Sequence, residues 1–229
     1  MKPLSINSLT MPADFPAGLF EQIFAASQRH ANNPAYGQFI GAWNAVSYRY
    51  VSLAEYDECF TSSIKKHGVA PGSGQDRYEQ ERDLFAFSSN AYSVFEAFHY
   101  GMFAIGSFIK PEIFVLAAPA DETKVSVAAT HKKYGEAFPT DPILASFKGY
   151  SDDLARLDLS LLRNVLTHRA APPRAYSLTV GPKDAKPSAE ITRVNIALDE
   201  NTTQSRRKDV SRLLTICVKA AETFVTSKL

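Results

Sequence analysis

Hydrophobic residues recur at intervals of three and four along most of the chain, which is the spacing typical of amphipathic α-helices. Such runs, bounded by proline, glycine and capping residues, predict helices over residues 16–30, 34–67, 75–109, 121–137, 151–171 and 201–227. The clearest loop covers residues 68–74, where three glycines and a proline occur within seven positions. The pattern therefore predicts a mainly α fold, a helical bundle.

The period changes near the C-terminus. Residues 176–180 and 194–198 alternate between apolar and polar positions, and the run 181–188 between them is rich in turn-forming residues. Alternation is the pattern of a half-buried strand, so the sequence predicts a small two-stranded β-hairpin inserted into the bundle.

The stretch 84–109 is apolar on nearly all sides, and Phe85 belongs to it. A membrane span is one interpretation, but Glu96 and His99 lie in its middle, and a charge there costs about 2.5–3.5 kcal/mol on insertion scales. We therefore expect a buried helix at the centre of the bundle and no membrane partner.

The length of 229 residues, with 45 % hydrophobic and 21 % charged residues, suits a single globular domain over 1–229. Lysine and arginine number 25 against 24 acidic residues, a net charge of +1 that excludes a strongly basic nucleic-acid coat. Any polyanion would have to bind a local basic patch.

Cysteine usage and the N-terminus bear on the compartment. Cys59 and Cys217 lie far apart without ligand spacing, so we expect no structural zinc and two buried thiols in a reducing environment. The first sixteen residues lack the continuous apolar segment of a secretory signal peptide. A cytoplasmic location is therefore the expectation.

One polar strip stands out, at the end of the predicted helix 151–171. Residues four apart share a helix face, so Asn164 lies above His168, and Arg163 lies above Thr167. Pro172 and the proline after it must end the helix, which leaves the strip at an accessible edge.

The order Arg163, Asn164 and, four residues after Asn164, His168 resembles the motif of the HEPN superfamily of helical proteins. The resemblance implies a HEPN-like core over 75–229 with 1–74 as an N-terminal helical elaboration, and a homodimer in which two motif helices meet. It also implies metal-independent RNA cleavage without a cofactor, often in a toxin or defence effector with an antitoxin or other partner protein.

These residue types suit that chemistry. An imidazole titrates near pH ~6.5, so His168 is able to take the proton of a ribose 2′-hydroxyl, and the fork of donors on Arg163 suits phosphorane oxygens. Asn164 is expected to orient the phosphate or the imidazole. Arg169, Arg174 and Thr167 are the candidate substrate-binding residues. The run 206–208, Arg-Arg-Lys, is a further candidate for the RNA backbone.

A structural interpretation of the motif stays open beside the catalytic one. Arg163 would then pair with Glu81 or Asp83, and His168 would cap carbonyl groups at the helix end. The protein would be a non-catalytic HEPN-type accessory or interaction protein.

Two further interpretations concern the aromatic helix. Glu96 and His99 have the (i, i+3) spacing of carboxylate-bridged metal sites, but no second such pair occurs, which favours a buried hydrogen-bonded pair over a metal site. The same helix would form the wall of a small-ligand pocket if a large apolar cavity lay beside Phe95 and Phe98.

Overall fold

The computed structural model describes residues 5–6, 8–167, 173–177, 187–192 and 194–229, and 71 % of these residues are helical. This confirms the mainly α fold. The helices, in chain order, are α1 (Ala17–Ser27), the 3₁₀ turn η1 (Gln28–His30), α2 (Tyr36–His67), α3 (Gly74–Ile109), α4 (Pro119–Glu122), α5 (Val127–Ala137), α6 (Ile143–Asp152), α7 (Leu154–Leu166) and α8 (Asn201–Lys228).

Two helix boundaries differ from the prediction. The expected helix over 121–137 is two helices, α4 and α5, and Ser126 caps α5 by accepting a hydrogen bond from the backbone amide of Ala129. The expected helix start at 151 is wrong, because α6 continues to Asp152 and the backbone of Asp153 is extended before α7 begins.

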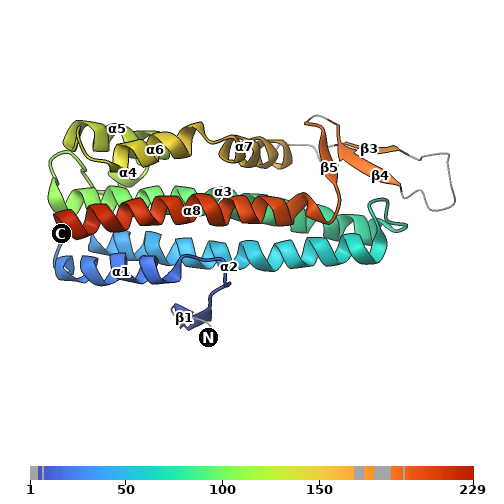
Figure 1. Cartoon of the computed structure of the whole chain (residues 1–229), viewed down its shortest axis with the longest axis horizontal. Helices are drawn as coiled ribbons and strands as arrows, with labels where there is room; N and C mark the ends of the chain where they lie inside the picture. Colours follow the sequence, from blue (N-terminus) through green and yellow to red (C-terminus); the bar gives the residue numbers. More distant parts are fainter. Residues whose placement is uncertain (1–4, 7, 168–172, 178–186, 193) are drawn as a thin grey trace. The chain divides into compact units, whose positions relative to one another are not determined.

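The β insertion has three strands rather than two. The strands β3 (Arg174–Ser177), β4 (Ser188–Ile191) and β5 (Ile196–Leu198) form an antiparallel sheet in the order β3-β4-β5. The two strands expected to pair with each other therefore both pair with β4 (Figure 1). A second, minimal pair joins β1 (Ser5–Ile6) to β2 (Leu9–Thr10).

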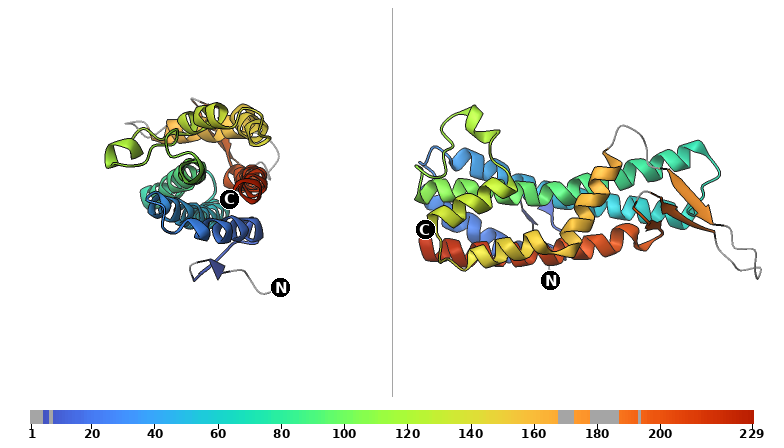
Figure 2. Two further views of the ribbon diagram at one scale, coloured as in Figure 1. Left: turned by 90° about the vertical axis from the view of Figure 1, so that its left-hand side faces the viewer. Right: turned by 90° about the horizontal axis from the view of Figure 1, so that it is seen from above.

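The chain divides into two compact units. Unit 1 comprises residues 1–51, 93–153 and 211–229, and unit 2 comprises 52–92 and 154–210. Helices α2, α3 and α8 each contribute residues to both units. Within unit 1 the helices form three layers: α1 with α2, then α3 with α8, then α5 with α6 (Figures 1 and 2).

Aromatic packing dominates the core of unit 1. Trp43 is 1 % exposed and stacks on Phe20 with ring centroids 4.5 Å apart, while its indole Nε1 donates a hydrogen bond to the Phe20 carbonyl at 3.2 Å. Phe39 also stacks on the indole, with centroids 5.2 Å apart. The buried indole thus satisfies its polar group within the core.

The core of unit 2 joins the sheet to the helices. Its buried residues are Phe60, Ile64, Leu84, Leu162, Val165, Leu166, Ala189, Ile191, Ile196 and Leu198. They come from α2, α3, α7, β4 and β5, so the alternating buried positions of β4 and β5 face the last turns of α7. This packing fixes the end of α7, where the motif lies.

Three expectations about burial are resolved. In the described part of the chain, no helix combines the length and the hydrophobicity that crossing a membrane would require. Phe85, expected inside the bundle, is 45 % exposed. Cys217 is buried as expected, but Cys59 is exposed, and both are free thiols.

Candidate functional site

Arg163 lies on the last turn of α7, half-buried, with its guanidinium against two side chains of unit 2. Its ζ-carbon is 5.5 Å from the ring centroid of Tyr92 on α3, in cation–π contact. Its Nη1 donates to the Asn164 Oδ1 at 3.4 Å. Asn164 is exposed. The side chains of Arg163 and Asn164 therefore lie together at the surface, as expected for neighbouring residues of the motif.

Thr167 follows the last residue of α7 and is also exposed. Its hydroxyl donates to the carbonyl groups of Arg163 at 2.9 Å and Asn164 at 3.3 Å. The Arg163 carbonyl also accepts the Thr167 backbone amide at 2.9 Å, so the amide and the hydroxyl of Thr167 together stabilise the helix terminus. His168 of the motif and the candidate substrate-binding residue Arg169 lie outside the described residues.

Arg174, a predicted substrate-binding residue, is instead part of the interior of unit 2. Its side chain is 1 % exposed; the Nε lies 2.8 Å from the Glu81 Oε1, and the Nη1 donates to the Gln80 Oε1 at 2.9 Å. The strand β3 is thereby fixed to α3. A guanidinium with so little exposure presents no charge to a polyanion, so the structure assigns Arg174 a structural role.

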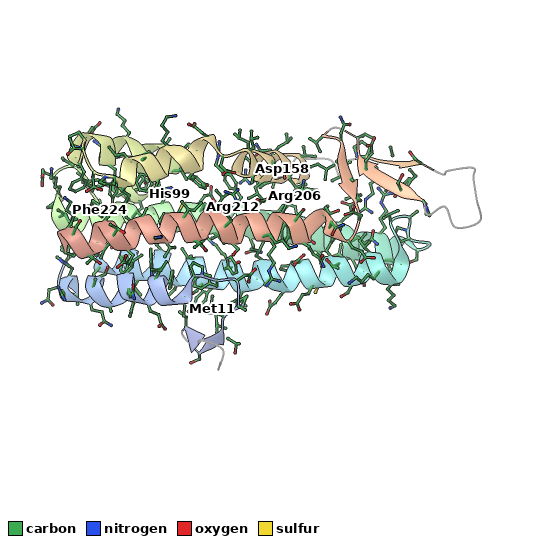
Figure 3. The ribbon with its side chains drawn as sticks, viewed as in Figure 1. Met11, His99, Asp158, Arg206, Arg212 and Phe224 are labelled. Atoms are coloured by element: carbon green, nitrogen blue, oxygen red, sulfur yellow. The ribbon has the colours of Figure 1, made fainter. Side chains whose placement is uncertain are left out.

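The basic run at the start of α8 is largely paired as well. Arg206 meets Asp158 of α7 through two nitrogens, at 2.7 and 3.1 Å, and Figure 3 shows the two side chains facing each other. Arg207 lies 3.3 Å from Asp57 of α2, which is 5 % exposed. Lys208 is exposed. Of this run, Lys208 therefore presents its charge most openly to solvent.

The two carboxylates considered as partners of Arg163 have other partners. Glu81 holds Arg174, and Asp83 lies 2.7 Å from the Arg82 guanidinium. In the described part of the chain, no carboxylate pairs with Arg163. The interpretation in which Arg163 pairs with Glu81 or Asp83 is therefore wrong.

The expected pair of Glu96 with His99 does not form. Glu96 is exposed, whereas His99 is buried in unit 1 with its Nδ1 2.8 Å from the Phe95 carbonyl. Burial lowers the pKa of His99 to about 3, and the neighbouring His131 contributes in the same direction. Among the described residues no group of three or more His, Cys, Asp or Glu side chains could hold a metal ion.

The aromatic wall expected for a ligand pocket is filled by side chains. Phe95 packs on Tyr150 with centroids 4.9 Å apart, and Phe98 packs between Trp43 and His99. A cavity of about 370 Å³ in unit 1 lies between α6 and α8, and its lining residues are Ala145, Ser146, Gly149, Tyr150, Asp153, Leu213, Ile216 and Cys217. Neither phenylalanine lines it.

An aromatic surface that was not expected from the sequence lies on α3 and ends at the motif. Tyr78 and Phe85 are 58 % and 45 % exposed on α3, and Tyr92, which contacts Arg163, follows at the same interval of seven residues. That interval is visible in the sequence. It marks one helix face without telling whether the face is buried or exposed.

Comparison with known proteins gives no match: no protein-family model fits the chain, and no curated protein and no solved structure is significantly similar to it.

Proposed function

We propose that the protein is a metal-independent endoribonuclease of the HEPN kind, with Arg163, Asn164 and His168 as its catalytic residues. The observation that carries the proposal is the state of Arg163. Arg174, Arg206 and Arg207 are all bound to carboxylates, whereas Arg163 is held by a ring and an amide. Its charge is therefore available to a phosphate.

In the proposed reaction a ribose 2′-oxygen attacks the adjacent phosphorus while His168 accepts the 2′-proton. Arg163 donates hydrogen bonds to the phosphorane oxygens, and Asn164 orients them. The bond from phosphorus to the 5′-oxygen then breaks, and that oxygen takes a proton from a general acid. The products are a 2′,3′-cyclic phosphate and a 5′-hydroxyl, so DNA is not a substrate.

A second copy of the chain would supply the general acid. Leu154, Leu157 and Leu161 form a row along one face of α7 and are 80 %, 45 % and 46 % exposed. Adjacent apolar side chains at the surface are typical of an interface. Pairing through this row would place two copies of α7 side by side and bring Asn164, about 60° from Leu161 around the helix, near the partner. Arg163 lies about 160° from Leu161, on the side of α7 that contacts Tyr92.

The test is cleavage of a labelled single-stranded RNA by the purified protein in excess EDTA. Wild type should give 2′,3′-cyclic phosphate ends, and Arg163→Ala or His168→Ala should lower the rate by about 10²–10⁴-fold. Lys219→Ala removes an exposed cation from α8 and serves as the matched control, with an unchanged rate. Unimpaired cleavage by folded His168→Ala would refute the proposal.

The dimer has its own test. Leu157→Lys places a charge in the leucine row without disturbing a buried position, so it should give a folded monomer by light scattering and abolish cleavage. A variant that is monomeric and fully active would show that one chain carries the complete site. A wild type that cleaves RNA and is monomeric at all concentrations would have the same meaning.

A second candidate function is supported by the same leucine row. An interaction protein without catalysis would use the exposed face of α7 for a partner protein, and the ion pairs of Arg174 and Arg206 would stabilise that face. This function predicts no RNA cleavage by wild type. It also predicts that Leu157→Lys loses a protein partner while Arg163→Ala retains it.

A further inference from the structure

Helix α3 carries a row of large aromatic side chains on one face within unit 2. Tyr78, Phe85 and Tyr92 are spaced by seven residues, which is close to two turns, so they lie above one another at intervals of about 10.5 Å. Tyr78 is 58 % exposed and Phe85 is 45 % exposed, and Tyr92 is partly covered by Arg163. The row therefore ends at the proposed catalytic residues.

The exposure of this row is not a general property of α3. Phe87 and Leu84, adjacent on the other side of the helix, are fully buried. Single exposed apolar residues are common on protein surfaces, but several large ones in a line usually mark a binding surface. Two such rings leading to a third at a candidate active site indicate a surface for the same ligand.

The cation available to an anionic ligand lies at the end of the row. Arg163 contacts Tyr92 and is not bound to a carboxylate among the described residues. Arg82 lies on the same face between Tyr78 and Phe85 with its side chain 49 % exposed, but Asp83 binds its guanidinium at 2.7 Å.

Of the nearby acidic groups of α3, Glu81 and Asp76 lie against basic side chains, whereas Glu79 meets only a neutral amide and keeps its charge. Glu81 is bound to Arg174, and Asp76 lies 3.2 Å from the His67 Nδ1. Glu79 accepts a hydrogen bond from the Gln75 side chain at 2.9 Å. Exposed rings alternating with arginines are the combination that binds single-stranded nucleic acids, since bases stack on the rings and phosphates meet the cations.

We infer that the row formed by Tyr78, Phe85 and Tyr92 binds single-stranded RNA and leads the strand to Arg163. The inference rests on the proposed ribonuclease function for the choice of RNA. The distance along the helix from Tyr78 to Tyr92 is about 21 Å, because fourteen residues rise about 1.5 Å each. A stacked strand advances about 3.4 Å per nucleotide, so the row spans about six nucleotides.

The test measures binding separately from cleavage. The probe is a fluorescein-labelled single-stranded RNA octamer with 2′-O-methyl groups at every position, which cannot be cleaved by attack of a 2′-hydroxyl, and fluorescence anisotropy gives its Kd. Tyr78→Ala and Phe85→Ala should each raise the Kd by about tenfold. Phe85→Trp retains a ring and should bind as wild type does.

Tyr48→Ala is the matched control. Tyr48 is 48 % exposed on α2 and belongs to unit 1, whereas the row belongs to unit 2. Its Kd should be unchanged. A tetramer of the same chemistry should bind more weakly than the octamer, because it cannot reach from Tyr78 to Arg163. An RNA duplex should also bind more weakly, since its bases are not free to stack on the rings.

The outcomes separate this inference from the proposed function. Cleavage of unmodified RNA that proceeds with unchanged KM in Tyr78→Ala and Phe85→Ala would overturn the inference and leave the ribonuclease intact. If octamer binding depends on the rings but the protein cleaves no RNA, the inference that the row binds RNA is supported and the proposed ribonuclease function is refuted. A folded wild type that binds no octamer would overturn the inference.

Discussion

Acid should destabilise the fold through His99. In the folded protein this imidazole is fully buried among Phe98, Phe147 and Tyr150, and its pKa is lowered to about 3 from the ordinary value of 6.5. The unfolded chain binds the proton below pH 6.5, whereas the folded chain binds it only near pH 3. Stability is therefore independent of this group above about pH 7 and falls as the pH falls through that window.

The magnitude follows from the separation of the two pKa values. Each pH unit below 6.5 costs about 1.4 kcal/mol of unfolding free energy, so at pH 5 the loss through His99 is about 2 kcal/mol. Urea denaturation of wild type and His99→Phe at pH 7.5 and pH 5 isolates this contribution. Phenylalanine keeps a ring of similar size in the site and cannot titrate.

Wild type should lose about 2 kcal/mol more than His99→Phe between the two pH values. Both proteins contain the carboxylates and His131, so the contributions of these groups to the pH dependence cancel in the comparison. The loss of the hydrogen bond to the Phe95 carbonyl also cancels, because it changes the stability of the variant at both pH values. Parallel pH dependences of the two proteins would refute the assignment of His99 as a buried neutral imidazole.

Two further predictions concern stability and are checked by urea denaturation at neutral pH. Gly106→Ala should cost about 1–3 kcal/mol, because its β-carbon would lie 2.6 Å from the Phe114 ring, whereas Gly41→Ala meets nothing within 4 Å and should stabilise α2 by about 0.5–1 kcal/mol. Equal effects of the two would contradict the packing. Arg174→Met should cost about 2–3 kcal/mol, since it leaves the Glu81 carboxylate without its cation; a neutral result would show that the ion pair contributes nothing.

Much of the helical architecture is readable in the sequence because its signals are local. The glycines of the loop before α3 and the capping residues before α8 mark helix ends directly, and the structure places those helices at 74–109 and 201–228. The end of α6 is not readable from the sequence, because acidic residues favour a helix start, and here Asp152 ends α6 in an ion pair with Lys148. Strand β4, of four residues, is too short to show a period.

In the candidate site, too, some contacts are predictable from the sequence and others are not. Arg163 and Asn164 are adjacent in sequence on one helix, so their proximity could be predicted. The ion pair of Arg174 with Glu81 joins positions 93 residues apart, and no local pattern distinguishes that arginine from one that binds substrate. The aromatic row was visible as a spacing, but its exposure depends on which elements cover α3, which is a property of the tertiary structure.

The position of Trp43 has a practical consequence for studying the two units. It is the sole tryptophan of the chain, it lies in unit 1, and its indole is enclosed by Phe20 and Phe39. Its fluorescence therefore reports on the integrity of unit 1, whereas far-ultraviolet circular dichroism reports on the helices of both. Because α2, α3 and α8 are shared, we expect the two signals to change at the same denaturant concentration. Separate midpoints would show that the two units unfold independently.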